Sequence, residues 1–166
     1  MWRFVFALLL VLVCESSGRP QSVVAAVSLE EAEFAYERGE YTQAARLFSP
    51  LAEQGVASAQ FYLGVMHEKG RGVRQDYPTA LTWFRKAAAQ GFAGPQANLG
   101  LMYERGRGVR KDVVRALMWY HIANTLLHGD EGKAAAKRRD YLTSHMTAEQ
   151  IEQAQEMARR CQQSQF

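Results

Sequence analysis

Apolar residues recur every three to four positions along most of the chain after residue 28, which is the spacing of one face of a helix. Leu29, Ala32 and Tyr36 form the first such face. The pattern predicts helices over residues 28–38, 41–54, 58–69, 77–90, 133–142 and 148–162, with a further pair between residues 93 and 128. The sequence therefore predicts an all-α fold built from helix pairs.

Local signals mark where several of these helices begin and end. Capping boxes, with Ser or Thr at the N-cap and Glu or Gln three residues later, occur at Ser28 with Glu31 and at Thr147 with Gln150. Pro50 lies inside a predicted helix, so we expect a kink or an early break there.

One stretch of the chain is written twice. Residues 60–87 return 36 positions later as residues 96–123, and 15 of the 28 aligned positions are identical. Self-similarity at this period is typical of a solenoid of stacked supersecondary units. A more divergent earlier copy aligns Phe48 with Phe84 and Gln54-Gly55 with Gln90-Gly91, but lacks the glycine-rich loop.

The repeated residues predict how each unit is built. Gly64 lies in mid-helix, where glycine costs about 1 kcal/mol against alanine, so we expect two helices to approach closely there. We expect Val73 to fold back into the core and Asp76 to cap the next helix. Trp83, Trp119 and Tyr120 recur at core spacing and are interpreted as packing residues.

The pattern A-x-x-x-L-G-x-x-[HY]-x-x-G-x-G-V-x-x-D-x-x-x-A-x-x-W, present from Ala59, resembles the Sel-1-like repeat family, a relative of the tetratricopeptide repeat. Pro95 departs from it where the first full unit has Ala59, and His67 departs where the second has Tyr103. The resemblance implies a right-handed α/α superhelical solenoid. Its units would be a degraded repeat (27–56), two full repeats (57–92 and 93–128) and C-terminal capping helices (129–166).

The first 26 residues predict a secretory signal rather than part of the fold. Arg3 precedes an apolar run from Phe4 to Val13, and its ten residues are fewer than the roughly 20 that a spanning helix needs. Cleavage is expected after Ala26, with Gly18 as the alternative. Val13 stands where a lipobox requires a small residue, which disfavours lipid anchoring at Cys14.

We therefore expect a periplasmic or secreted protein of a Gram-negative-type bacterium, with no stable membrane insertion after cleavage. Cys161 would then be the single remaining cysteine. It could link two chains in a disulfide homodimer, or pack as a half-buried residue on an apolar helix face, which we favour.

Charge is unevenly distributed along the chain. Residues 28–56 hold six acids and two bases, whereas residues 57–126 hold ten bases and four acids. In a solenoid, sequence neighbours remain spatial neighbours, so we expect an acidic end and a basic middle. Ordinary solvated faces explain such a distribution equally well.

The sequence holds little that indicates catalysis or cofactor chemistry. The four histidines form no pair at zinc-binding spacing, and the glycine-rich basic loops follow helices and lack the Lys-Ser/Thr ending of a phosphate-binding loop. We therefore expect no metal, no cofactor and no catalytic residue. The modest charge of an exported chain also argues against nucleic acid as a partner.

The resemblance implies a non-enzymatic protein-interaction module of the bacterial envelope that binds a protein or peptide segment. By likeness to tetratricopeptide repeats, the first helix of each unit would line the concave face. The expected partner-binding residues are Phe61, Tyr62, Val65, Glu68, Lys69, Asn98, Leu101, Glu104 and Arg105.

Within this set, the apolar side chains Phe61, Val65 and Leu101 stand at positions interpreted as not needed for the core. Asn98, with Lys69 and Arg105, could hold the backbone or terminal carboxylate of a peptide. The alternative is an exported enzyme that binds or hydrolyses β-lactams, as cysteine-rich members of the family do. The lack of cysteine pairs disfavours it.

Overall fold

The computed structural model describes residues 28–126 and 129–163, so the expected signal segment and Cys14 lie outside the described residues. The described ranges hold eight helices and no strand. The helices are α1 (Leu29–Glu37), α2 (Tyr41–Glu53), α3 (Ala57–Lys69), α4 (Tyr77–Ala88), α5 (Ala93–Arg105), α6 (Val113–Leu126), α7 (Gly129–Thr143) and α8 (Ala148–Gln163).

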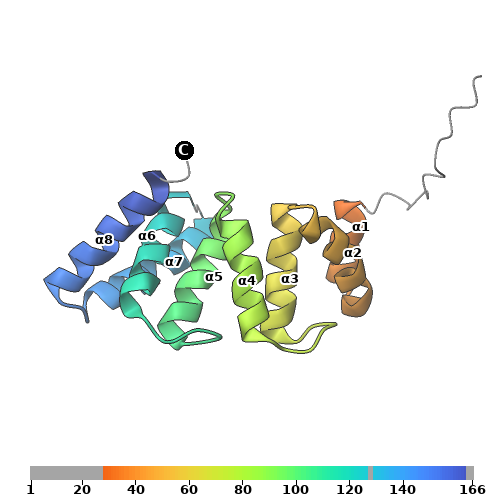
Figure 1. Cartoon of the computed structure of the whole chain (residues 1–166), viewed down its shortest axis with the longest axis horizontal. Helices are drawn as coiled ribbons and strands as arrows, with labels where there is room; N and C mark the ends of the chain where they lie inside the picture. The colour runs from red at the N-terminus through yellow and green to blue at the C-terminus, as the bar shows by residue number, and fades with distance from the viewer. Residues whose placement is uncertain (1–27, 127–128, 164–166) are drawn as a thin grey trace, which may run out of the picture.

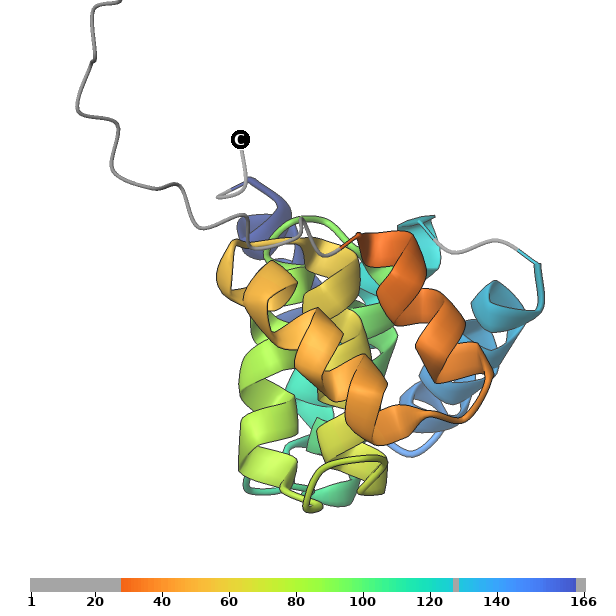
Figure 2. The same cartoon turned by 90° about the vertical axis from the view of Figure 1, so that its right-hand side faces the viewer.

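Figure 1 shows α1 to α6 following one another along the long axis of the molecule, with α8 at the opposite end from α1 and α7 beside α6. Helices α1 and α2, α3 and α4, and α5 and α6 form successive pairs, and each pair packs on the next. Both α7 and α8 pack on α6. The end-on view in Figure 2 shows the α3–α6 helices stacked behind the first pair. The all-α solenoid expected from the repeat is confirmed.

Helix ends follow the predicted capping chemistry. The backbone N–H of Glu31 donates to Ser28 Oγ at 3.0 Å. The capping box that opens α8 is reciprocal, because the Gln150 N–H donates to Thr147 Oγ1 at 3.3 Å and the Thr147 N–H donates to Gln150 Oε1 at 3.1 Å. Asp76 accepts from the Thr79 N–H at 3.2 Å.

Helix α2 continues through Pro50 as far as Glu53, so an early break does not occur, whereas the alternative expectation, a kink, stays a prediction. Proline removes one hydrogen-bond donor and crowds the carbonyl four residues earlier. Pro50 lies three residues before the end of the helix, where the remaining turn is short and the buried side chains of Leu51 and Ala52 hold it to the core.

The glycine-rich loop of each full repeat packs closely against the preceding helix pair. Gly72 and Gly108 have φ angles of +69° and +67°, which side chains rarely adopt. A Cβ on Gly72 would meet the backbone of Tyr41, and one on Gly108 would meet the backbone of Tyr77. These glycines are therefore required both by conformation and by the close approach of another helix.

Gly64 and Gly100 in mid-helix also mark close approaches, as predicted for the first. A Cβ on Gly64 would lie 2.5 Å from Cε1 of Phe84, and one on Gly100 would lie 2.7 Å from Cε1 of Tyr120. Within each full repeat, therefore, an aromatic ring of the second helix rests on the backbone of the first.

Three clusters of buried apolar residues form the core. Phe48 and Phe84, both fully buried, belong to the first and third clusters. Val73 packs against the first cluster, which confirms that it folds back into the core. Trp83 and Trp119 are half-buried against these clusters and Tyr120 is buried, so their interpretation as packing residues is confirmed.

Helix α8 covers α6 with its apolar stripe. Ala154 and Ala158 are buried, and Ile151, Met157 and Cys161 are half-buried beside them in the second cluster. Cys161 therefore packs on an apolar helix face, as the favoured interpretation expected, and its position gives no support to a disulfide-linked homodimer.

Candidate functional site

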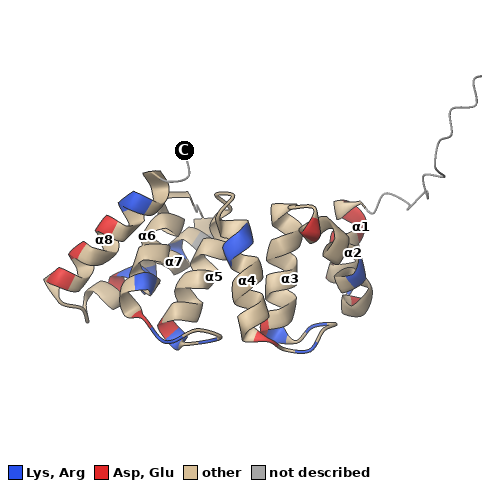
Figure 3. Cartoon of the chain, in the orientation of Figure 1, with Lys and Arg blue, Asp and Glu red and all other residues tan. Residues whose placement is uncertain are grey.

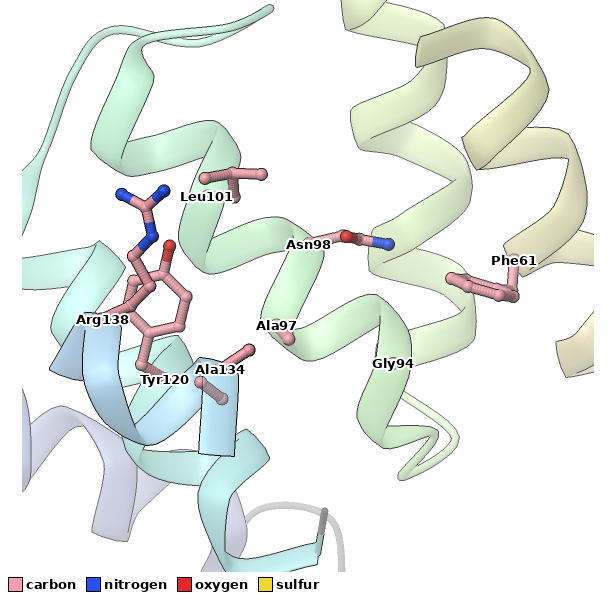
Figure 4. Close-up of a pocket in the computed structure, with 9 residues that line it drawn as sticks. Phe61, Gly94, Ala97, Asn98, Leu101, Tyr120, Ala134 and Arg138 are labelled. Atoms are coloured by element: carbon pink, nitrogen blue, oxygen red, sulfur yellow. The ribbon is translucent and has the colours of Figure 1, made fainter. Parts of the chain in front are cut away.

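A hollow of about 300 Å³ opens between α3, α5, α6 and α7, and we refer to it as the α5 hollow. Figure 4 shows Phe61 on one side, Tyr120 and Arg138 on the other, and α5 between them. Its lining consists mainly of apolar and small residues: Phe61, Gly94, Ala97, Asn98, Leu101, Tyr120, Ala134, Ala135 and Arg138.

One polar cluster stands at the α7 side of the hollow. The hydroxyl of Tyr120 donates to Glu104 Oε2 at 2.7 Å, and Nη1 of Arg138 donates to Glu104 Oε1 at 2.9 Å. The Glu104 side chain is 13% exposed. Burial, and then the hydrogen bond to Glu104, raise the pKa of Tyr120 far above its usual range, so the phenol stays protonated as a donor.

Three of the predicted partner-binding residues, Phe61, Asn98 and Leu101, line the hollow together. Glu104 lies beside it through its bonds to Tyr120 and Arg138. Lys69 and Arg105 are exposed at the ends of α3 and α5.

The remaining predicted residues take part in packing or in ion pairs. Val65 is 9% exposed and belongs to the third core cluster, so the interpretation that the core does not need it is wrong. Tyr62 stacks on Phe48 with ring centroids 4.6 Å apart. Glu68 pairs with Arg107 at 3.4 Å.

Sequence reasoning did not identify Gly94, Ala134, Ala135 or Arg138, and it assigned Tyr120 to packing alone. Three of these residues lie on α7, where the repeat register is lost, so no earlier copy indicates their position. Tyr120 had one usable signal, because it aligns with Phe84 yet carries a hydroxyl that needs a partner when buried.

The arginines of the glycine-rich loops are engaged between units. Nη1 of Arg71 donates to the hydroxyl of Tyr36 at 3.0 Å, and the Arg71 guanidinium lies 5.1 Å from the ring centroid of Tyr41. Arg107 pairs with Glu68 and lies 5.5 Å from the ring centroid of Tyr77. These loop cations hold neighbouring units together.

Two further hollows lie at the loops, one of them around His67, Arg74 and Asp76. His67 Nδ1 is buried there without a hydrogen-bond partner, although the His67 ring as a whole is half-buried. In the part of the chain that the structure describes, no group of three His, Cys, Asp or Glu side chains could hold a metal ion. None of the helices described is both long enough and apolar enough to cross a membrane.

Comparison with protein-family models shows which kind of repeat this architecture contains. Residues 57–92 and 96–126 match the family model described as Sel1 repeat. A search of curated proteins finds no match.

Several solved structures are similar to the chain, among them the following two. One is a protective antigen present in uropathogenic Escherichia coli strains displaying an SLR fold, with 31% identity and a TM-score of 0.73 over 80% of this chain. The other is a Sel1 repeat protein from Oxalobacter formigenes, with 31% identity and a TM-score of 0.65 over 81% of this chain. The matches cover 28% of the first structure's chain and 56% of the second's.

Stacked helix pairs, two of which have the same glycine-rich loop between their helices, define an α/α solenoid protein. The family model and both similar structures identify its repeats as Sel1 repeats, and the chain belongs to the Sel1-like repeat family. Sel1 repeat proteins are generally protein-interaction modules without catalytic activity.

Proposed function

We propose that the chain is a non-enzymatic adaptor or regulatory module of the bacterial envelope, which binds a segment of a partner protein in the α5 hollow. The α5 hollow itself is the main support for this proposal. It gathers three residues, Phe61, Asn98 and Leu101, from two consecutive units and is closed at one side by α7. A concave, largely apolar site with a few polar groups suits an inserted side chain.

The hydrogen bonds among the polar side chains beside the hollow also favour an interaction role over catalysis. The Glu104 carboxylate accepts from both Tyr120 and Arg138, so it serves as a structural anchor rather than as an unengaged base. Turnover of nitrocefin by the purified chain above that of a heat-killed control would favour the β-lactam enzyme instead.

The binding site is tested by crosslinking pull-down from envelope extract. We expect the double variant Leu101→Asp with Ala134→Asp to lose partners that the wild-type chain captures, because two charges would enter an apolar site. Ala89→Asp is the matched control, since Ala89 is exposed and outside the hollow. Each variant must keep the wild-type melting temperature, and an unchanged partner set for the double variant would exclude the hollow.

The envelope location belongs to the same proposal and rests on the N-terminal signal predicted from residues 1–26. We expect the chain expressed with its own N-terminus to appear in a periplasmic extract or in the medium. Its measured mass should correspond to cleavage after Ala26 or, in the alternative, after Gly18. An uncleaved chain in the cytoplasmic fraction would contradict export.

A further inference from the structure

The two full repeats differ where they face the α5 hollow. Position 61 holds phenylalanine in the first full repeat, and the equivalent position 97 holds alanine. Position 62 holds tyrosine, and position 98 holds asparagine. The second repeat therefore lacks two aromatic rings that the first repeat contains.

In the first repeat these rings fill space between neighbouring helices. The Phe61 ring lies 6.2 Å from the ring of Phe84 and 5.5 Å from that of Phe92, measured between centroids. Tyr62 stacks on Phe48 in the preceding pair. In the first repeat, aromatic rings therefore fill the space beside Phe84, whereas the equivalent space beside Tyr120 in the second repeat is part of the α5 hollow.

Repeat equivalence indicates where the missing ring of position 97 would lie. Phe84 aligns with Tyr120, so a ring at position 97 would extend toward Tyr120, and Tyr120 lines the α5 hollow. Helix α7 does not fill the space, because it presents Ala134 and Ala135 there. The hollow therefore has the position and lining suited to one aromatic ring.

Charge at the rim favours an anionic neighbour for that ring. Glu104 is bound by Arg138, and Arg105 lies close enough to act on Tyr120 electrostatically. Among the described side chains that act on this cluster, two guanidiniums and one carboxylate leave an excess of one positive charge. In the described residues, Arg138 donates to Glu104 through Nη1 alone, and its side chain is 44% exposed, so other N–H groups of its guanidinium are available to a carboxylate.

From these observations, we infer that the α5 hollow binds an aromatic side chain of a partner peptide, with the side-chain carboxylate of an adjacent acidic residue held by Arg138. This inference rests on the proposed function and makes it specific. The proposed occupant is an internal acidic residue rather than a chain terminus, and a peptide with a free terminal carboxylate distinguishes the two.

The test uses defined peptides and backbone amide NMR of the labelled chain. The probe is N-acetyl-Ala-Asp-Phe-Ala-amide, and its comparison peptides replace Asp by Asn, or Phe by Ala, or end in Phe with a free carboxylate and no Asp. We expect the probe to shift the amides of Ala97, Asn98 and Leu101. Loss of the carboxylate should weaken binding about tenfold, as for a charge-assisted hydrogen bond, and loss of the ring should abolish it.

Variants of the chain test the same assignment. Ala97→Phe restores the ring of the first repeat and should weaken binding at least tenfold, whereas Ala89→Phe, the same substitution at an exposed position, should not. Ala134→Phe fills the hollow from α7 and serves if Ala97→Phe fails to fold. Arg138→Gln should remove the preference for Asp over Asn and keep the requirement for Phe.

Equal binding of the Phe and Ala peptides, or wild-type affinity in a folded Ala97→Phe chain, would overturn the inference. Tighter binding of the peptide with the free terminal carboxylate would overturn the choice of an acidic side chain. If the envelope pull-down depends on Leu101 and Ala134 while none of the peptides binds, this inference fails and the proposed function stands. If the peptides bind as expected but the pull-down is unchanged by the double variant, the proposed function fails instead.

Discussion

At the residue scale, close packing outweighs helix propensity at the mid-helix glycines. Gly64 would gain about 1 kcal/mol of helix propensity as alanine. Its Cβ would nevertheless lie 2.5 Å from the buried Phe84 ring, closer than real Cβ contacts. Phe84 is fully buried, so the ring has little room to move away.

We therefore expect Gly64→Ala to lower the free energy of unfolding by about 1–2 kcal/mol, since overpacking outweighs propensity. Gly94→Ala is the matched control, because its Cβ would meet the Phe61 ring at an ordinary 3.6 Å. Urea denaturation should show the control to be neutral or slightly stabilised. A Gly64→Ala chain at least as stable as the wild type would contradict the packing argument.

His121 gives a second residue-scale prediction. Burial, and then the positive charges of Arg139 and Arg159, lower the pKa of His121 from its usual value near 6.5. The unfolded chain therefore takes up this proton at a higher pH than the folded chain does. The associated stability is complete above about pH 6.5 and decreases as the pH falls toward the lowered pKa of the folded state.

We expect His121→Gln to lose less stability than the wild type when the pH is lowered from 7.5 to 5, because glutamine does not titrate. Melting temperatures across this range measure the effect. Asn124→Gln is the control, since Asn124 lies on the same helix and the substitution changes no titrating group, so it should leave the wild-type slope unchanged. Parallel slopes for wild type and His121→Gln would show that another group governs this range.

At the scale of elements, each of the two full repeats binds the helix pair before it through an arginine. Arg71 reaches Tyr36 and Arg107 reaches Glu68 from the glycine-rich loops. Glu104 aligns with Glu68, but its arginine is Arg138, which comes from the middle of α7. Helix α7 thus supplies at the C-terminal side the contact that a loop supplies elsewhere.

This contact predicts that Arg138→Ala loosens α7. The variant leaves the mostly buried Glu104 carboxylate with Tyr120 as its remaining described partner, and we expect the free energy of unfolding to fall by about 1–2 kcal/mol. Arg160→Ala is the control, because Arg160 is 76% exposed and pairs with Glu156 on its own helix. Its effect should stay within about 0.5 kcal/mol. Hydrogen exchange should show faster opening of α7 in the first variant, and equal behaviour of the two would contradict this role.

How far the sequence predicts these elements depends on where their partners lie in the chain. Helices α3 and α4 were predictable because their caps, loop glycines and repeat period are local signals. Val65 was misassigned because helical spacing identifies a face but cannot tell whether the next helix pair covers it. Arg138 was missed since α7 follows the point at which the 36-residue register ends. The exchange of Phe61 for Ala97 was visible in the sequence, but the space that it opens depends on the position of α7.

At the scale of the whole molecule, ion pairs form inside the basic middle of the chain and leave its excess of bases in place. Figure 3 shows cations and anions together at the glycine-rich loops. Arg107 is paired with Glu68, and Arg115 with Asp112. The acidic character of the first helix pair acts locally, since Glu33 and Glu37 add to burial in raising the pKa of Tyr62. The ion pairs of Arg107 and Arg115 both lie within residues 57–126, so they do not offset the difference in charge between the acidic end and the basic middle.

The linear stacking of helix pairs makes a last prediction about how damage spreads. Helix α8 packs on α6 through Ala154 and Ala158, and Ala158 is 3% exposed. Ala158→Asp would bury a charge in this apolar contact, so we expect α8 to detach and expose the apolar surface of α6. In a solenoid each unit contacts its neighbours, so amide protection should be lost mainly in α6, α7 and α8 and largely retained in α1–α4.

Hydrogen exchange with mass spectrometry measures this loss of protection, and size-exclusion chromatography should show concentration-dependent self-association of the Ala158→Asp chain. Gln153→Asp, exposed on the same helix, should behave as the wild type. Uniform loss of protection along the chain would mean that the stacked pairs unfold as one unit and that the cap stabilises all of them.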